Sequence, residues 1–361
     1  MTDIRRDMMN TGWWIISLLF VLCLVGCSKK ESAPAMSAER PQTDCLVRMT
    51  PIKSQGRSDF CWIYAMLATI ESEHLLVDDS VNLSAHFLGR RHLEEQAERV
   101  YLSGGKKSIV TRGMAQDAID LMMRGGLTHF DAFQAKTNYR VTARKVEQAA
   151  RQAMAQRTGL EQMYKDVGRL LDEAIHPAQD KVFWLGAEYS PLEFAHSVCL
   201  PDEYIAMTSF THHPFGERFA LEVPDNHGNH AFLNMPIDSL MHRIEGALQS
   251  GHPVCWEGDT SEPGFSFKTG FAQLANEKDL ATQESRQQML DRLQTTDDHC
   301  MELVGMAHTR DGKRWFIAKN SWGKHNPFGG LMYLSENYVR AKTLAVWMSW
   351  KALDTKSLWN S

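Results

Sequence analysis

An apolar segment that begins with a cysteine places the tightest constraint on how this chain folds. Residues 61–76 read CWIYAMLATIESEHLL, with apolar side chains at helical spacing and no glycine or proline. The pattern predicts a helix that begins at Cys61. The unpaired N–H groups and the positive end of the dipole at a helix N-terminus favour a thiolate over a thiol. Cys61 is therefore a candidate nucleophile.

The rest of the chain divides into a helical half and a strand-rich half. Further helices are predicted after a cap at Ser84, at about 114–123, and as a paired insert at 141–174. After about residue 204, short apolar segments alternate with turns, which is typical of strands. The predicted strands are 204–209, 219–223, 253–256, 299–306, 315–320, 331–334 and 344–350. This order indicates an α+β protein with a helical lobe of about 55–200 and a β-rich lobe of about 201–352.

The N-terminus has the pattern of a secretory signal. Arg5 and Arg6 precede an apolar run at 13–25, which is short for a membrane span of about 20 residues. The run ends in the letters LVGC, which resemble the lipobox of bacterial lipoproteins. That resemblance implies removal of a signal peptide at 1–26 and acylation of Cys27. The alternative is an uncleaved anchor helix, and either arrangement tethers the protein to a membrane.

The expected location follows from this signal. Residues 27–46 are polar and rich in Ser, Ala and Pro, so they predict a flexible tether that nothing buries. Several acyl chains on one residue make a durable anchor. Ser28 after the lipidated cysteine favours the outer membrane of a bacterial cell envelope. The periplasmic and surface faces of that membrane both stay open.

Composition and charge exclude several classes of protein. The chain is 43% hydrophobic and 23% charged, as in globular proteins and unlike disordered or fibrous ones. A net charge of -5 leaves no basic excess to neutralise phosphates, so we expect no nucleic-acid partner. Five of the seven cysteines follow Cys23 and Cys27, and an odd number in an exported protein implies a free thiol.

Three polar residues elsewhere in the chain would complete a thiol site around Cys61. His299 opens a predicted strand, and its imidazole could form an ion pair with the thiolate and protonate a leaving amine. Asn320 ends the next predicted strand, where its amide could orient that imidazole. Gln55 precedes the cysteine closely and could donate to an oxyanion together with the N–H of Cys61. This set predicts hydrolysis through an acyl-enzyme.

These residues carry a resemblance to the papain-like cysteine peptidases of family C1. The matching segments are Gln55 ahead of Cys61-Trp62, Leu83-Ser84, Asp298-His299 with Val304-Gly305, and FIAKNSWG at 316–323. The resemblance implies a peptidase domain at 47–352 with the papain-like two-lobe fold and a cleft between the lobes. It assigns Cys61 as nucleophile, His299 as general acid and base, Asn320 as orienter and Gln55 as oxyanion donor. It also implies that the backbone of Gly113 binds substrate.

Within that family the chain is most similar to the bleomycin hydrolase and aminopeptidase C branch. The similar segments are 236–238 and 253–259, together with the wide gap between Cys61 and His299. This branch implies aminopeptidase-like hydrolysis of peptides or proteins without a cofactor. Endopeptidase activity stays open, as does the oligomeric state.

Three residues depart from the family pattern. Asp59 and Phe60 occupy positions that are usually small, and Arg112 stands where the first of two paired glycines is expected. They motivate an alternative function, a catalytically silenced surface lipoprotein that binds ligands with a peptidase fold.

Other polar residues receive simpler interpretations. We interpret the histidines at 212, 213, 227 and 230 as loop residues, because no carboxylate or cysteine framework of zinc spacing accompanies them, and we expect no metal. Cys300 is expected to be a core residue on the strand face opposite His299. Glu257 and Asp259 are candidates for binding a substrate amine.

Overall fold

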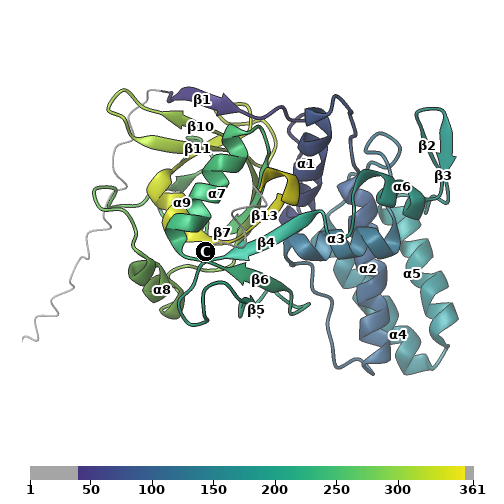
Figure 1. Cartoon of the computed structure of the whole chain (residues 1–361). Helices are drawn as coiled ribbons and strands as arrows, with labels where there is room; N and C mark the ends of the chain where they lie inside the picture. The colour runs from purple at the N-terminus through teal and green to yellow at the C-terminus, as the bar shows by residue number, and fades with distance from the viewer. Residues whose placement is uncertain (1–39, 354–361) are drawn as a thin grey trace, which may run out of the picture. The chain divides into compact units, whose positions relative to one another are not determined.

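The computed structural model describes residues 40–353, and helices precede most of the strands along this range (Figure 1). The predicted signal peptide, Cys27 and residues 27–39 of the predicted tether lie outside it. Contacts divide the chain after residue 33, so every described residue belongs to the unit 34–361. Within 40–353, no helix combines the length and the apolar character that crossing a bilayer requires.

The helical lobe is built from helices whose starts the sequence encodes. Its elements are α1 (Cys61–Leu76), α2 (Ala85–Leu102), α3 (Ala115–Gly125), α4 (Tyr139–Gln156), α5 (Leu160–Ala174), the hairpin β2 (Val182–Trp184) and β3 (Ala187–Tyr189), and α6 (Pro191–Val198). Ser84 caps α2 by accepting from the N–H of Phe87 at 3.2 Å. Asn138 caps α4 in the same way, accepting from the N–H of Val141 at 3.4 Å. The helix predicted from Cys61 and the predicted pair at 141–174 are confirmed as α1, α4 and α5.

The β-rich lobe is built on one mixed sheet. Along the sheet the strands follow the order β5, β6, β4, β13, β7, β10, β11, β12, β9 and β8, and β1 pairs with β10. Their bounds are β1 (Gln42–Leu46), β4 (Tyr204–Thr208), β5 (Arg218–Ala220), β6 (Ala231–Asn234), β7 (Val254–Gly258), β8 (Phe265–Ser266), β9 (Phe271–Ala272), β10 (His299–His308), β11 (Arg314–Lys319), β12 (Leu331–Ser335) and β13 (Thr343–Ser349). All seven predicted strands are present within a few residues of their predicted bounds, and the α+β class is confirmed.

Three helices of this lobe were not predicted: α7 (Ile237–Gln249), α8 (Gln283–Asp291) and α9 (Glu336–Lys342). α7 packs on β1, β7 and β10 with one apolar face that includes Leu240 and Ile244. α8 is polar along most of its length, so its pattern alone does not distinguish it from a loop. A short 3₁₀ turn, Trp350–Ala352, follows the last strand.

The predicted flexible tether, 27–46, is wrong at its C-terminal end, because its last residues belong to the sheet. Residues 42–46 form strand β1, which runs antiparallel to β10 with Gln42 opposite His308 and Leu46 opposite Gly305. The backbone of β10 can accept this strand closely because a Cβ on Gly305 would lie 2.3 Å from the carbonyl oxygen of Cys45. Most side chains of β1 are exposed, which explains why its composition resembles that of a linker.

Helix α1 joins the two lobes. It contacts α2 and α3 in the helical lobe and β7 and β10 in the β-rich lobe. Trp62, Met66 and Ile70 are buried, and so is the carboxylate of Glu71, which accepts from the N–H of Leu83 at 2.6 Å. A helix buried on opposite faces needs apolar residues around most of its circumference, as this one has. Its first residue, Cys61, therefore lies where the lobes meet.

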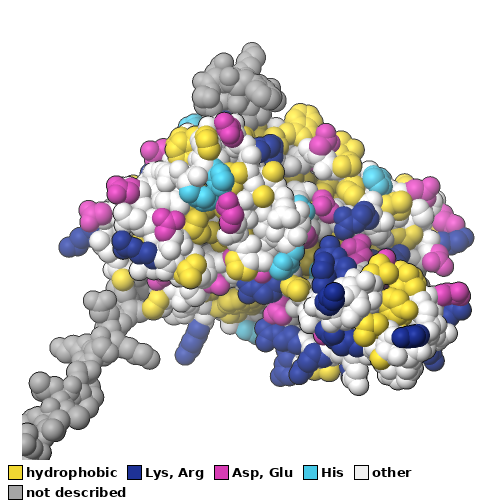
Figure 2. Space-filling model, turned by 90° about the horizontal axis from the view of Figure 1, so that it is seen from below, with side chains coloured by type: hydrophobic (Ala, Val, Ile, Leu, Met, Phe, Trp, Pro, Cys, Tyr) yellow, Lys and Arg dark blue, Asp and Glu magenta, His cyan; other side chains and the backbone are white. Residues whose placement is uncertain are grey.

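The exposed charges are unevenly distributed between the lobes. In the view from below, Lys and Arg side chains gather on the side of the helical lobe (Figure 2). Several basic residues of the helical lobe have acidic partners, such as Arg140 with Asp59 at 2.7 Å and Arg151 with Glu147 at 2.7 Å.

Candidate active site

Cys61 is the first residue of α1 and is partly exposed. In the described part of the chain no side chain caps this helix, which leaves the N–H groups of its first turn able to face the sulfur or a substrate. The residue before it, Phe60, is buried and packs edge-on against the rings of Trp62 and Tyr139. Phe60 thus fills the core behind the thiol instead of covering it.

His299 connects the thiol to an amide. Its Nε2 lies 2.9 Å from Oδ1 of Asn320, and its ring also hydrogen-bonds Cys61. Strands β10 and β11 run antiparallel, which brings the first residue of one strand beside the residue that follows the other. The indole of Trp322 lies over the imidazole at a centroid distance of 4.7 Å. His299 and Asn320 are both buried, so little water competes for the bond between them.

The surroundings of Cys61 favour its thiolate. A hydrogen bond from Cys300 is the largest of the effects that hold the pKa of Cys61 well below its usual range; burial opposes it, and the hydrogen bond and charge of His299 add to it. Burial raises the pKa of Cys300 well above its usual range, which keeps that thiol protonated and able to donate. Cys300 is buried as expected, but it contacts the candidate nucleophile, which strand alternation alone did not indicate.

Gln55 is fixed by the loop that follows Asn320. Its Oε1 accepts from Oγ of Ser321 at 2.6 Å, and its backbone N–H donates to the carbonyl of Ser321 at 2.8 Å. Its Nε2 donates to the carbonyl of Ser58 at 2.9 Å. An amide nitrogen carries two protons, so one donor of Gln55 is not used by this bond. The four predicted site residues thus come from three neighbouring segments: the loop and helix start at 55–61, the start of β10 and the loop after β11.

Comparison with known proteins identifies the family. The sequence model of the Peptidase C1-like family matches residues 134–359, a range that includes His299 and Asn320. This chain belongs to the Peptidase C1-like family. The predicted cysteine peptidase and the resemblance to papain-like enzymes are confirmed at this level. No curated protein sequence matches the chain.

Comparison with solved structures supports the same fold through one of them. PepW from Lactobacillus rhamnosis superposes with a TM-score of 0.69 over 90% of this chain and 85% of its own, at 16% identity. The bromelain protease from Ananas comosus has a TM-score of 0.42 and 13% identity over 83% of this chain and 94% of its own. The likeness to PepW shows that this C1-like peptidase has the papain-like two-lobe fold.

In this C1-like peptidase, Gly113 lies beside the residue that follows the thiol. It is buried in the loop before α3, and a Cβ there would lie 3.2 Å from Cε2 of Trp62. Nε1 of Trp62 donates to the carbonyl of Thr111 at 3.1 Å, which fixes the same loop. The loop thus runs alongside the start of α1.

Arg112 crosses from this loop to the β-rich lobe. Its Nε lies 2.8 Å from both carboxylate oxygens of Asp225, and its NH2 donates to the carbonyl of Asp297. The guanidinium is 45% exposed, whereas the carboxylate of Asp225 is 9% exposed. The departure from the family's paired glycines therefore places a cation between the lobes, near Cys61.

Besides Asp225, two further buried carboxyl side chains, those of Asp297 and Glu257, belong to this region. Burial, and then the charge of Asp225, raise the pKa of Asp297 to about 6. Burial also raises the pKa of Glu257 well above its usual range, with Asp297 and Cys61 adding to the effect. Oε2 of Glu257 is buried, and no group among residues 40–353 donates a hydrogen bond to it. Of the two acidic residues proposed for a substrate amine, Glu257 thus lies near the thiol, whereas Asp259 pairs with Lys342 at 3.3 Å.

The carboxylate of Asp59 is neutralised by neighbours. It accepts from NH2 of Arg140 at 2.7 Å and from Oγ1 of Thr111 at 3.0 Å. Because both bonds draw the carboxylate toward the helical lobe, Asp59 opposes the Cys61 thiolate less than its position in the sequence suggested.

Two of the histidines interpreted as loop residues share one carboxylate partner, which their spacing in the sequence did not indicate. His212 and His213 both contact Glu222, and the three ligand atoms lie within 4.8 Å of one another. His230 instead contacts Asp117 at 2.8 Å. Glu222 follows His213 by 9 residues and His212 by 10, which matches no familiar zinc motif. The three residues are therefore recognised as a cluster in the structure and not in the sequence.

Proposed function

We propose that this peptidase hydrolyses peptide bonds through an acyl-enzyme on Cys61 and that it acts as an aminopeptidase. The observation that carries the proposal is the position of His299, which hydrogen-bonds both Cys61 and Oδ1 of Asn320. A thiolate, an imidazole and an orienting amide in that order are what nucleophilic catalysis by cysteine requires.

Each of the four site residues has one role in the proposed reaction. The Cys61 thiolate attacks the carbonyl carbon, and the carbonyl electrons move to oxygen, where the N–H of Cys61 and Nε2 of Gln55 donate. His299 gives its proton to the leaving nitrogen as the C–N bond breaks, which leaves a thioester. His299 then takes a proton from water, the hydroxide displaces the sulfur, and the carboxylic acid leaves. The bond from His299 to Asn320 keeps the ring in one orientation throughout.

Aminopeptidase specificity is supported by the carboxyl groups beside the thiol. The ammonium of a free N-terminus is a cation, and Glu257 lies near Cys61 with an oxygen to which no other described residue donates. Binding an ammonium would give that oxygen a donor and would favour ionisation of the carboxyl group. The similarity of the chain to the bleomycin hydrolase and aminopeptidase C branch points the same way.

The catalytic part is tested with Cys61→Ala. This variant should lose hydrolysis of a fluorogenic dipeptide and keep the circular dichroism spectrum and melting temperature of the parent. Cys199→Ala removes another buried thiol, at the end of α6, and should retain activity. Full activity of Cys61→Ala would refute the mechanism.

The specificity is tested with one peptide in two forms. A dipeptide substrate with a free N-terminus should be cleaved with a higher kcat/KM than its acetylated form. Glu257→Gln should narrow this ratio, because the amide cannot form an ion pair. A preference for the acetylated form would exclude the aminopeptidase and leave an endopeptidase.

We also propose that Cys27 is acylated and that the enzyme acts from the outer membrane of a bacterial cell envelope. The support is the LVGC segment after a short apolar run and the serine at position 28. Metabolic labelling with a fatty-acid analogue should tag the parent and leave Cys27→Ala untagged. Equal labelling of both would reject the lipid site.

A further inference from the structure

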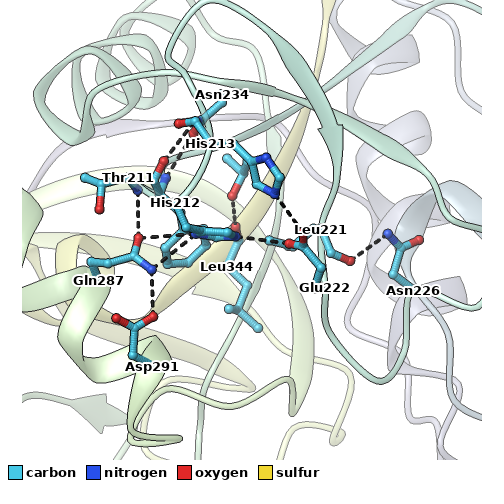
Figure 3. A network of polar contacts seen from close by, with 12 residues as sticks. Thr211, His212, His213, Leu221, Glu222, Asn226, Asn234, Gln287, Asp291 and Leu344 are labelled. Carbon is cyan, nitrogen blue, oxygen red and sulfur yellow. Dashed lines mark hydrogen bonds and ion pairs between the residues drawn. The ribbon is translucent and has the colours of Figure 1, made fainter.

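Two histidines and a glutamate form a group on the β-rich lobe. Nε2 of His212 lies 3.0 Å from Oε2 of Glu222, and Nε2 of His213 lies 2.7 Å from Oε1 of the same carboxylate. The three side chains are between 32% and 59% exposed, so an ion could reach them from solvent. Figure 3 shows both rings directed at the carboxylate from the connection between β4 and β5.

The backbone makes this convergence possible. Neighbouring residues of a strand point to opposite faces, but 212 and 213 lie in a turn, and their rings lie 4.7 Å apart. Nδ2 of Asn234 fixes that turn by donating to the carbonyls of Phe210 at 2.8 Å and of His213 at 2.9 Å. The group is therefore held by the fold, not only by its own contacts.

Each histidine ring is also supported on its other side. The ring of His213 stacks on Phe219 at a centroid distance of 4.1 Å, with 25° between the planes. Nδ1 of His212 faces the amide of Gln287 on α8, with Oε1 at 3.4 Å and Nε2 at 3.2 Å (Figure 3). A partner on the second ring nitrogen is typical of histidines that bind metals, because it fixes the tautomer and the ring orientation.

The chemistry of the three donors suits one class of ion. A glutamate side chain is ordinarily a carboxylate at neutral pH, and Glu222 presents both of its oxygens to the two imidazoles. Two imidazoles and one carboxylate are a common donor set for zinc and too rich in nitrogen for Mg²⁺ or Ca²⁺.

The distances suit the same ion. With metal–ligand bonds of about 2.0–2.1 Å, two ligand atoms of a tetrahedral zinc site lie about 3.3 Å apart. The nitrogen-to-oxygen distances of 3.0 and 2.7 Å are already close to that value. Small side-chain shifts would admit an ion between them. A metal bound at Nε2 requires each ring to carry its proton on Nδ1, where Oε1 of Gln287 at 3.4 Å can accept it from His212.

We propose that His212, His213 and Glu222 bind one divalent transition-metal ion, with Zn²⁺ as the best match, and that water completes the tetrahedron. The ion would tie the turn after β4 to the segment after β5. It would act on the stability of the β-rich lobe and take no part in the chemistry at Cys61. The proposal is independent of the proposed peptidase mechanism.

The test is a zinc titration of the full chain that carries Cys61→Ser. This background removes the candidate nucleophile, because a thiolate beside an imidazole is itself a zinc ligand. Calorimetry at pH 7.5 should show one equivalent of zinc more than in the same chain with Glu222→Gln or His213→Gln. Zinc should raise the melting temperature of the background protein, and this rise should be absent in both variants.

His227→Gln is the matched control. His227 is an exposed histidine of the same region, five residues after Glu222, and this variant should bind zinc like the background protein. X-ray absorption of the zinc-loaded background protein should show nitrogen and oxygen ligands without sulfur, a readout that needs no further variant. Equal zinc binding in the Glu222→Gln chain, or sulfur in the coordination shell, would overturn the proposal.

Discussion

Arg112 places its Nε 2.8 Å from both carboxylate oxygens of Asp225, and this ion pair joins the helical lobe to the β-rich lobe. The same guanidinium donates to the carbonyl of Asp297, two residues before His299. A substrate ammonium that enters this region would meet carboxyl groups that already have a cation. Arg112 is therefore expected to compete with cationic substrates and to hold the lobes together.

Arg112→Gln should separate these two effects. We expect a higher kcat/KM for peptides with a free N-terminus, because Asp225 and Asp297 lose a competing cation. We also expect a loss of about 1 kcal/mol in the free energy of unfolding, a modest value because the guanidinium is half exposed. Kinetics and urea denaturation measure the two changes. Arg124→Gln, which breaks an exposed ion pair with Glu95 at 3.2 Å in the helical lobe, is the control; a lower kcat/KM for free-amine peptides in Arg112→Gln alone would contradict the competition.

Cys300 should set the acid limb of the pH profile. Its hydrogen bond is the largest effect that lowers the pKa of Cys61, so Cys300→Ala should raise that pKa and move the rise of kcat/KM to higher pH. Cys300→Ser keeps an O–H donor and should restore part of the shift. Profiles from pH 4 to 9 measure it, with Cys255→Ala as a buried-thiol control in the neighbouring strand. Identical acid limbs in the parent and Cys300→Ala would show that the Cys300 thiol does not lower the pKa of Cys61.

The sequence predicted the residues around the thiol better than it predicted their partners. Cys61 begins a helix because an unbroken apolar segment follows it. His299 begins strand β10 and Asn320 follows the end of β11, and the antiparallel pairing of these two strands brings the residues together. The structure confirms these locally predicted elements. The contact between Cys61 and Cys300 depends on how α1 lies across β10, and no local pattern encodes that packing.

Two other features show the same limit. The sequence separation of Glu222 from His212 and His213 does not predict that these side chains meet, because their contact depends on the turn between β4 and β5. Strand β1 was interpreted as part of a tether because exposed polar side chains describe a linker and an edge strand equally well. The first feature depends on how the turn between two neighbouring strands folds, and the second on the pairing of β1 with the distant strand β10; composition predicts neither.

Gln55 should contribute to catalysis through its amide donor. Gln55→Ala should lower kcat by about 10²–10³-fold with a small change in KM, as expected when one oxyanion donor is lost. Ser321 holds Oε1 of Gln55 at 2.6 Å, so Ser321→Ala should cause a smaller loss of kcat by freeing the amide to rotate. Ser54→Ala removes a nearby hydroxyl that accepts from the backbone N–H of Gly56 at 3.3 Å and should leave kcat unchanged. A Gln55→Ala variant with unchanged kcat would remove Gln55 from the oxyanion site.

Asp297 should make the enzyme less stable as the pH rises. Burial and the charge of Asp225 raise its pKa from 3.8 to about 6, so the folded state binds this proton more tightly than the unfolded state. Stability from this proton is present below pH 4 and is lost as the pH rises to about 6. The full difference is about 3 kcal/mol, since one pKa unit corresponds to about 1.4 kcal/mol. Asp297→Asn should therefore be more stable relative to the parent at pH 7.5 than at pH 4.5 in urea denaturation, and the opposite trend would place the ionised carboxylate in a stabilising pair with Arg112.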